Sequence, residues 1–182
     1  MPLFKDDYVK TEKMNGVIYN MSPSGGFNHA TINGNIDHII KSSLKDSICM
    51  VFMENLDLYL SEDEYVIPDV MVICDRNHIT AKGYKGTPRF IAETLSPSTA
   101  FKDRTVKKEK YAQIGVEEYW IIDPRSKAIE IYHLKEKEYI LENSLMYVED
   151  AEDESYNAET ELSLYAFPNI KMRLEEIFRN TL

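Results

Sequence analysis

The sequence between residues 65 and 74 is the feature that most constrains the fold of this chain. It is apolar almost throughout, and Asp69 interrupts it directly after Pro68. An apolar run of this length is typical of a strand covered on both faces. Proline is tolerated only near the start of a strand, at an edge or at a bulge. The run therefore predicts a central strand of a layered fold, with a carboxylate inside its core.

The remaining elements are predicted from periodicity and turn residues. Apolar residues at helical spacing between His29 and Leu44 predict a first helix, and hydroxyl residues at 96–99 and a later Gly115 mark the start and end of a second. Strands are predicted at 8–21, with a turn at residues 15–16, at 49–60, with an irregularity near residue 54, and at 90–95 and 118–122. The C-terminal part is predicted to form a hairpin of 128–134 with 138–141, a strand at 162–164 and a helix at 173–179. This order indicates an α/β or α+β fold, a mixed sheet flanked by helices.

The length and composition indicate one domain. With 182 residues and a hydrophobic fraction of 43%, the chain can bury one core but is short for two large domains. We expect a single domain over residues 1–182, with the core at about 12–134. The C-terminal part, residues 135–182, is expected to contain the hairpin, an acidic loop and a short helix.

The sequence contains no membrane or secretion signal. No apolar run reaches the roughly 18 residues needed to cross a bilayer, and the first residues lack the apolar core of a secretory signal. We therefore expect a cytoplasmic protein with no membrane partner. The two cysteines, Cys49 and Cys74, lie among apolar neighbours, which favours free buried thiols over a disulfide or a zinc site.

The charge of the chain is negative but unevenly distributed. The net charge is −10, whereas proteins that grip nucleic acid broadly carry a basic surface. Residues 149–154 contribute five carboxylates, and residues 102–110 contribute five basic side chains against two acids. The net charge therefore does not exclude nucleic acid as a partner.

Two carboxylates fall inside predicted core strands. By the alternation of strands, Asp69 shares a face with Met71 and Ile73, and Glu93 lies between Ile91 and Leu95. Two buried carboxylates repel one another unless a cation lies between them, and Mg²⁺ prefers oxygen ligands of this kind. Taken alone, Asp69 is explained better by a carboxylate that caps a turn after Pro68.

The second helix adds a lysine to this pair. At 100° per residue, Asp103, Lys107 and Tyr111 lie on one face with Ala100 and Ile114, so Lys107 is predicted to point inward. An ion pair with Asp103 at the helix surface would also explain Lys107. Asp69, Glu93 and Lys107 together favour a metal site that hydrolyses phosphodiester bonds.

These residues carry a family resemblance. The segments at 67–70, 91–99 and 115–124, together with Asp103, Lys107 and Tyr111, resemble the Uma-two family of restriction endonucleases, within the PD-(D/E)xK nuclease superfamily. The similarity extends from about residue 12 to the terminal helix. The superfamily's usual lysine would fall at Leu95, and the Uma-type pattern instead resembles a lysine that has moved to the following helix, at Lys107. Val17 replaces a glutamate that many relatives carry.

The resemblance implies a fold, a reaction and a set of roles. It implies a restriction-endonuclease-like mixed sheet with an added C-terminal hairpin, and a Mg²⁺-dependent or Mn²⁺-dependent endonuclease that acts on DNA as a homodimer. Asp69 and Glu93 would hold the metal with the Leu95 backbone carbonyl, and Lys107 would orient the attacking water or stabilise the transition state. The auxiliary candidates are Glu12, His29, Asp103 and Tyr111.

Two alternatives stay open from the sequence. A nuclease fold whose catalysis has decayed would serve as a binding or assembly module, which the acidic charge and Val17 make plausible. Hydrolysis of a small phosphoester would use the same residues without a polymer substrate. The sequence does not separate DNA from RNA.

Overall fold

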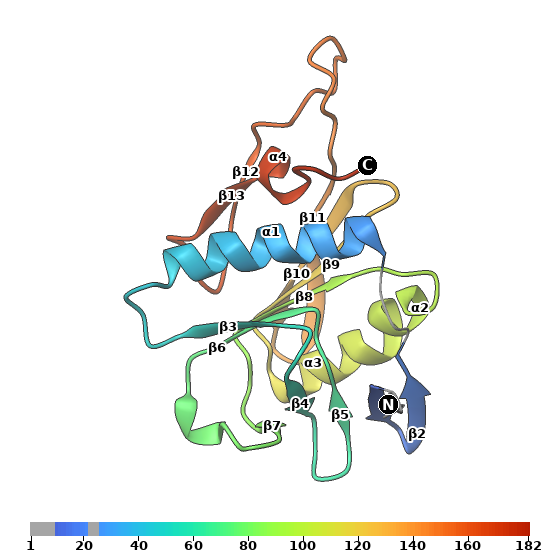
Figure 1. Cartoon of the computed structure of the whole chain (residues 1–182), viewed down its shortest axis with the longest axis vertical. Helices are drawn as coiled ribbons and strands as arrows, with labels where there is room; N and C mark the ends of the chain where they lie inside the picture. Colours follow the sequence, from blue (N-terminus) through green and yellow to red (C-terminus); the bar gives the residue numbers. More distant parts are fainter. Residues whose placement is uncertain (1–9, 22–25) are drawn as a thin grey trace, which may run out of the picture.

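A computed structural model describes residues 10–21 and 26–182 of the chain (Figure 1). Its largest element is a six-stranded sheet with the strand order β11-β10-β9-β8-β6-β3. Neighbouring strands run antiparallel except for β8 and β9, which are parallel. The strands are β3 (Met50–Met53), β6 (Val70–Ile73), β8 (Phe90–Thr94), β9 (Glu118–Asp123), β10 (Ala128–Lys135) and β11 (Glu138–Met146).

Two smaller sheets and a few helices surround the central sheet. A five-stranded sheet contains β1 (Thr11–Met14), β2 (Val17–Asn20), β4 (Asp57–Tyr59), β5 (Tyr65–Val66) and β7 (Gly83–Tyr84), and a two-stranded sheet pairs β12 (Glu161–Ser163) with β13 (Lys171–Arg173). The helical elements are α1 (Phe27–Ser43), η1 (Arg76–His78), α2 (Ala100–Lys102), η2 (Asp103–Lys107), α3 (Lys108–Ile114) and α4 (Leu174–Ile177). The mixed α+β fold predicted from the sequence is confirmed.

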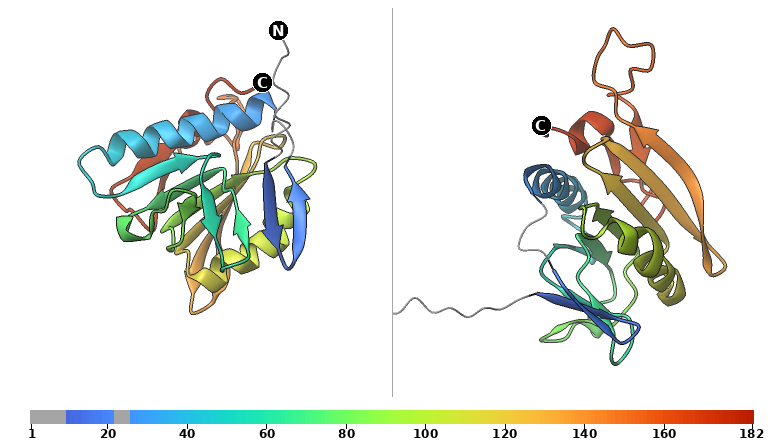
Figure 2. Two further views of the ribbon diagram at one scale, coloured as in Figure 1. Left: turned by 60° about the horizontal axis from the view of Figure 1, so that its bottom comes forward. Right: turned by 90° about the vertical axis from the view of Figure 1, so that its right-hand side faces the viewer.

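The two faces of the central sheet are covered differently (Figure 2). On one face, α1 and the segment containing α4 pack over Val70, Val72 and Trp120. On the other face, α3 and the five-stranded sheet pack over Met71 and Tyr119. Successive residues of one strand thus enter opposite cores, which is why these strands read as continuous apolar runs.

The apolar run at 65–74 forms two strands rather than one. β5 belongs to the five-stranded sheet and β6 to the central sheet, and the chain crosses between them at Ile67, Pro68 and Asp69. The single strand predicted from hydrophobicity is wrong here, because both sheets bury apolar side chains and the pattern does not register the crossing. The consequence is that Asp69 lies directly before β6.

The predicted helix at 100–114 is confirmed, with one irregularity in its middle. α2, η2 and α3 follow one another without a break, and η2 is a π-helical segment. A π-helical turn rotates the side chains that follow it, and such turns occur frequently at functional sites. Asp103 and Lys107, at the two ends of η2, both point inward and are buried. Gly115 ends the helix in the left-handed conformation.

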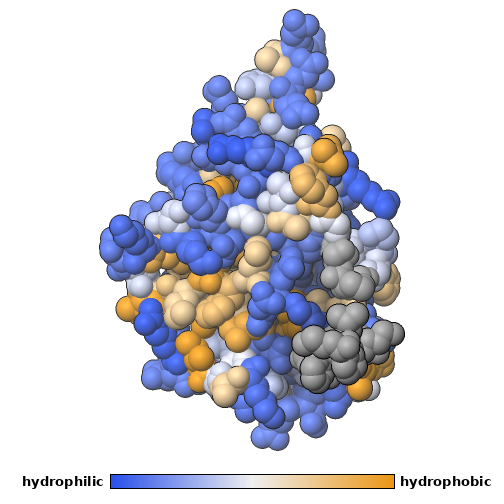
Figure 3. All heavy atoms as spheres, in the orientation of Figure 1, coloured by the Kyte–Doolittle hydropathy of each residue, from blue (hydrophilic) through white to orange (hydrophobic). Residues whose placement is uncertain are grey.

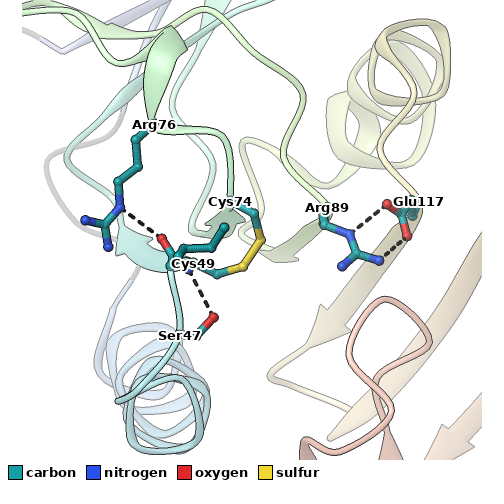
Figure 4. The surroundings of a disulfide bond; sticks show 7 residues. Ser47, Cys49, Cys74, Arg76, Arg89 and Glu117 are labelled. Carbon is teal, nitrogen blue, oxygen red and sulfur yellow. Dashed lines mark hydrogen bonds and ion pairs between the residues drawn. A yellow bond between two sulfur atoms is a disulfide. The ribbon is translucent and has the colours of Figure 1, made fainter.

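The structure corrects the expectation of free cysteines. Cys49 and Cys74 form a disulfide (Figure 4). They directly flank β3 and β6, in which Met50 faces Ile73, so the antiparallel register brings the two cysteines opposite one another. The sequence conceals this pairing because the residues are 25 positions apart, and only the strand register brings their Cα atoms to 4.0 Å.

The acidic loop at 149–154 is exposed, as predicted, and lies at the protruding end of the molecule, at the top of Figure 1. This end is mostly hydrophilic in the space-filling view (Figure 3). Within residues 10–21 and 26–182, every helix falls short of the length and apolarity that a membrane span requires. The part of the predicted N-terminal hairpin before residue 10 lies outside the described residues.

Candidate functional site

The end of β8 brings Asp69 and Glu93 together. Val70 pairs with Ala92 across β6 and β8, so the register sets Asp69 opposite Glu93. The backbone N–H of Asp69 donates to Glu93 Oε2 over 3.4 Å, and the N–H of Thr94 donates to Asp69 Oδ2 over 2.8 Å. Both carboxylates are buried. β6, which begins after Asp69, and β8, which contains Glu93, are thus neighbours in the central sheet.

Lys107 reaches Glu93 from η2. Its Nζ lies 3.1 Å from Glu93 Oε1 and 3.6 Å from Asp103 Oδ1, and the side chain is only 3% exposed. The hydroxyl of Tyr111, one turn later, donates to Glu93 Oε1 over 2.6 Å. The alternative of a helix-surface ion pair between Asp103 and Lys107 is wrong, because both residues are buried.

Glu12 is the closest partner of Lys107. It comes from β1 in the other sheet, and its Oε1 lies 2.7 Å from Lys107 Nζ. The same oxygen accepts the backbone N–H of Ile67, and Oε2 lies 3.2 Å from Lys102 Nζ. Burial by itself would raise the pKa of Glu12, but the two lysines outweigh burial and lower it. Glu12 is therefore the carboxylate that stays ionised beside Lys107.

Glu93 and Asp103 behave in the opposite way. Burial raises the pKa of Glu93 well above its usual range, and the neighbouring carboxylates add to that rise while Lys107 opposes it. Burial likewise raises the pKa of Asp103, whose Oδ1 accepts no hydrogen bond from any described residue. Burial would lower the pKa of Lys107, but the surrounding carboxylates raise it well above 10.5. The buried carboxylates around Lys107 thus outnumber the cations that could pair with them.

A second group of polar residues lies around Asp69. His29, in the first turn of α1, places Nε2 3.2 Å from Asp69 Oδ2 and Nδ1 3.5 Å from Glu54 Oε1. Asn33, one turn further along α1, donates to Glu54 Oε1 over 2.8 Å and accepts from Thr94 Oγ1 over 2.6 Å. His29 was an auxiliary candidate, whereas Glu54 and Asn33 were missed.

Each missed residue left a trace in the sequence. Asn33 follows His29 by four positions on the apolar face of α1, where Ile32 and Ile36 also lie, so a second polar residue there is informative. Glu54 marks the irregularity predicted near that position. It has a φ of 52°, and its N–H donates to the Asp69 carbonyl, so this left-handed turn between β3 and β4 sets its side chain beside the site.

The pKa of His29 follows from these contacts. Burial by itself would lower the pKa, but hydrogen bonds to Asp69 and Glu54 outweigh burial and raise it to about 10. The pKa of Glu54 is lowered in return, first by its hydrogen bond to His29. In the absence of metal, His29 is therefore a cation that shields Asp69.

The charge balance of the site fits a divalent cation. Five carboxylates form ion pairs with three cationic groups, and Lys10 adds a fourth cation near Glu54, which leaves an excess of one negative charge when all are ionised. Burial is the main cause of the raised pKa of Glu93, and the neighbouring carboxylates add to it. The carboxylates are Glu12, Glu54, Asp69, Glu93 and Asp103, and the three paired cationic groups are His29, Lys102 and Lys107. Hard oxygen donors with net negative charge are the ligands that Mg²⁺ and Mn²⁺ prefer.

A cavity of about 300 Å³ lies beside this site. His29 and Leu95 belong to its wall, together with the first residues of α1 and Arg125. The first turn of α1 has no side-chain cap, so its backbone N–H groups carry the positive end of the helix dipole. An anionic group of a substrate would fit this environment.

The basic side chains of the α2–α3 helix are engaged with the protein itself. Lys102 binds Glu12, Arg104 binds Glu130 and Lys110 binds Glu64. The positive local charge predicted from residues 102–110 therefore does not form a patch of unpaired cations. Val17, the position where relatives carry glutamate, is exposed on β2 and is not part of the contacts described above.

Comparison with known proteins assigns the family. The family model Uma2, described as "Putative restriction endonuclease", matches residues 1–167. The chain belongs to this Uma2 (Uma-two) family. The crystal structure of a protein from Anabaena variabilis, described as "a putative nuclease belonging to DUF820", superposes with a TM-score of 0.70 and 18% sequence identity, over 92% of this chain and 89% of that one. This likeness shows the fold. A search of curated proteins found no match.

Proposed function

We propose that this Uma2 protein is a metal-dependent endonuclease that hydrolyses phosphodiester bonds in DNA. The convergence of Asp69, Glu93 and Lys107 at the end of β8, in a site with excess negative charge, is the observation that carries the proposal. Membership of a restriction endonuclease family supports the same reaction class. DNA, rather than RNA or a small phosphoester, is the substrate to be tested first.

We assign each side chain a role that follows from its contacts. Asp69 and Glu93 would hold Mg²⁺ or Mn²⁺, with the carbonyl of Leu95 at the end of β8 as a further ligand. Such an ion lowers the pKa of water and offsets charge on a phosphate. Lys107 would orient the attacking water and stabilise the negative charge of the transition state.

Neighbouring residues hold these groups in place. The hydroxyl of Tyr111 fixes one oxygen of Glu93, and Glu12 fixes the ammonium of Lys107 from β1. Asp103 lies at the start of η2, where Tyr119 donates to its backbone carbonyl. These contacts limit the rotamers of Glu93 and Lys107, so little ordering is left for the substrate to induce.

The polymer substrate would approach through the cavity at the first turn of α1. Backbone N–H groups there and Arg125 offer contacts for phosphate groups beside the scissile one. The acidic loop at 149–154 lies at the protruding end of the molecule, so its carboxylates are not part of this wall (Figure 1). The net charge of −10 is thus compatible with a local approach of DNA.

Cleavage assays with matched variants test the proposal. We expect nicking of plasmid DNA with Mn²⁺ or Mg²⁺, and a loss of at least about 100-fold in Asp69→Asn and Glu93→Gln. Glu93→Gln resembles the protonated form that burial favours, so its fold should persist. Glu117→Gln is the control, because Glu117 forms an exposed pair with Arg89.

The substrate class is read out in parallel. Single-stranded RNA and bis-p-nitrophenyl phosphate report RNA cleavage and small-phosphoester hydrolysis, the two outcomes that would replace DNA as the substrate. If none of the three substrates is cut with either metal, the proposed activity is refuted.

A binding or assembly module is the second candidate. The pairing of Lys102, Arg104 and Lys110 with carboxylates favours it, because these side chains are not free to bind phosphate groups. A module of this kind would bind Mn²⁺ or nucleic acid without cutting it. If the protein binds Mn²⁺ or nucleic acid saturably but cleaves no substrate, a binding or assembly module becomes the better assignment.

We also propose that the protein forms a homodimer through β11. This nine-residue strand is the edge of the central sheet, and Ile140, Leu141 and Met146 are exposed on it. An edge of this length offers unpaired backbone groups to a second copy. Light scattering after gel filtration should give twice the monomer mass, and Leu141→Lys should give the monomer. A monomeric wild-type protein would refute the dimer.

We propose the cytoplasm as the compartment. Cytosolic thiols are kept reduced in most organisms, so in this compartment the disulfide between Cys49 and Cys74 would be opened to two thiols and would form again when the purified protein is oxidised. Labelling with a maleimide in intact cells, before and after reduction, tests this assignment. Cysteines that react with maleimide only after reduction would argue against the cytoplasm.

A further inference from the structure

The side chains of His29, Glu54 and Asp69 converge where the chain enters β6. One potential ligand atom from each of the three lies within 4.8 Å of the other two. The separation of 3.2 Å between His29 Nε2 and Asp69 Oδ2 is close to the roughly 3 Å between neighbouring ligands of an octahedral ion with bonds of about 2.1 Å. The three side chains come from α1, from the turn after β3 and from the start of β6.

We propose that these three residues hold a second metal ion, of the Mn²⁺ type, with Asp69 shared between the two ions. This inference rests on the proposed function and deepens it, because the site becomes a two-metal centre. One ion would bind at Asp69 and Glu93, and the other at Asp69, His29 and Glu54. The imidazole of His29 disfavours Mg²⁺, which prefers oxygen ligands alone, and the two carboxylates suit Mn²⁺, which follows Mg²⁺ in its ligands but binds mixed sites more tightly.

The surroundings of the three residues support a built site. Asn33 donates to Glu54 Oε1 and accepts from Thr94 Oγ1, so it joins α1 to β8 and fixes the Glu54 carboxylate. Such outer contacts orient metal ligands in known sites. The backbone bond from Glu54 N–H to the Asp69 carbonyl holds the turn against β6.

Access and charge agree with this assignment. His29 forms part of the wall of the 300 Å³ cavity, so an ion can enter from solvent. His29 lies between two carboxylates, with one ring nitrogen 3.5 Å from Glu54 and the other 3.2 Å from Asp69. Asn33 also holds the half-exposed Glu54 toward this imidazole, so the three side chains stay together.

Counting bound Mn²⁺ tests the inference without using activity. Isothermal titration of the metal-free protein should give two Mn²⁺ per chain. His29→Gln and Glu54→Gln should each weaken the second ion by at least about tenfold and keep the first. Two ions that share Asp69 are magnetically coupled, so the six-line electron paramagnetic resonance signal of Mn²⁺ should be lost at two equivalents and return in Glu54→Gln.

Controls separate folding from binding. Asp37→Asn lies on the same helix, paired with Lys41 on its surface, and should bind two ions like the wild type. Melting temperatures in EDTA identify any variant that is unfolded, and Glu54→Gln carries the test if His29→Gln does not fold.

The outcomes separate the inference from the nuclease proposal. Binding of one Mn²⁺ per chain, unaffected by His29→Gln and Glu54→Gln, would overturn the second metal site. If the protein still cleaves DNA in that case, the nuclease proposal stands. Two ions bound as expected, with no cleavage of any nucleic acid, keeps the second site and overturns the nuclease.

Discussion

Replacing Lys107 by methionine should destabilise the protein strongly, because it removes the cation that balances buried Glu12. At the observed 2.7 Å, Coulomb's law with an effective dielectric constant of about 20 assigns about 6 kcal/mol to this pair. Removing the lysine also removes the cost of burying its charge, and Lys102 still contacts Glu12 at 3.2 Å. We therefore expect a net loss of about 3 kcal/mol in the free energy of unfolding, the lower end for breaking a buried pair.

The loss should depend on pH in a defined direction. In the wild type the pKa of Glu12 is lowered, so its contribution to stability is present above pH 4.5 and is lost as pH falls through the folded pKa. In Lys107→Met, burial dominates and raises that pKa above 4.5, so the variant loses stability as pH rises past 4.5. The difference between the two proteins should be small near pH 4.5 and largest at pH 8.

Denaturant unfolding in EDTA measures this difference. Trp120 is the single tryptophan and is fully buried, so its fluorescence reports the unfolding of the core. The double variant Glu12→Gln, Lys107→Met should recover more than half of the loss, because no ionised carboxylate is left unpaired at that position. Equal stability of Lys107→Met and wild type at pH 8, or no recovery in the double variant, would refute the argument.

Three further predictions concern the scaffold. Burial raises the pKa of Glu118 to about 7 from 4.5, so the folded state binds the proton of Glu118 more tightly than the unfolded state does. The free energy of unfolding should therefore fall by up to about 3 kcal/mol as pH rises from 4.5 to 7. Chemical denaturation at several pH values should show that this free energy depends less on pH in Glu118→Gln. Cys49→Ser opens a crosslink between residues 25 positions apart, which should cost about 3 kcal/mol in the chain-entropy model, and a melting temperature unchanged by the variant or by reductant would contradict this. Gly83→Ala would drive its Cβ into the backbone oxygen of Asp57 in β4, so a loss of about 1–3 kcal/mol is expected by thermal melting. Gly34→Ala, with open space around it in α1, should be neutral or stabilising.

Local sequence patterns determined the parts of the site that depend on side-chain direction. Alternation in the strand at 90–95 placed Glu93 on the inward face, and helical periodicity placed Lys107 and Tyr111 toward it. The mixed fold followed from the order of elements, and the Asn15-Gly16 turn followed from residues that tolerate a positive φ. Such patterns act over a few residues, so the chain encodes them directly.

The tertiary structure decided which partners these side chains meet. Glu12 reaches Lys107 because β1 of one sheet packs against the helix that covers the other, and Glu54 reaches His29 through a left-handed turn. Strand register likewise joined Cys49 to Cys74. Contacts of this kind depend on loop geometry and sheet register, which no local pattern of polarity records. The sequence by itself determined that two carboxylates and a lysine are buried; only the fold decided how many further charges surround them.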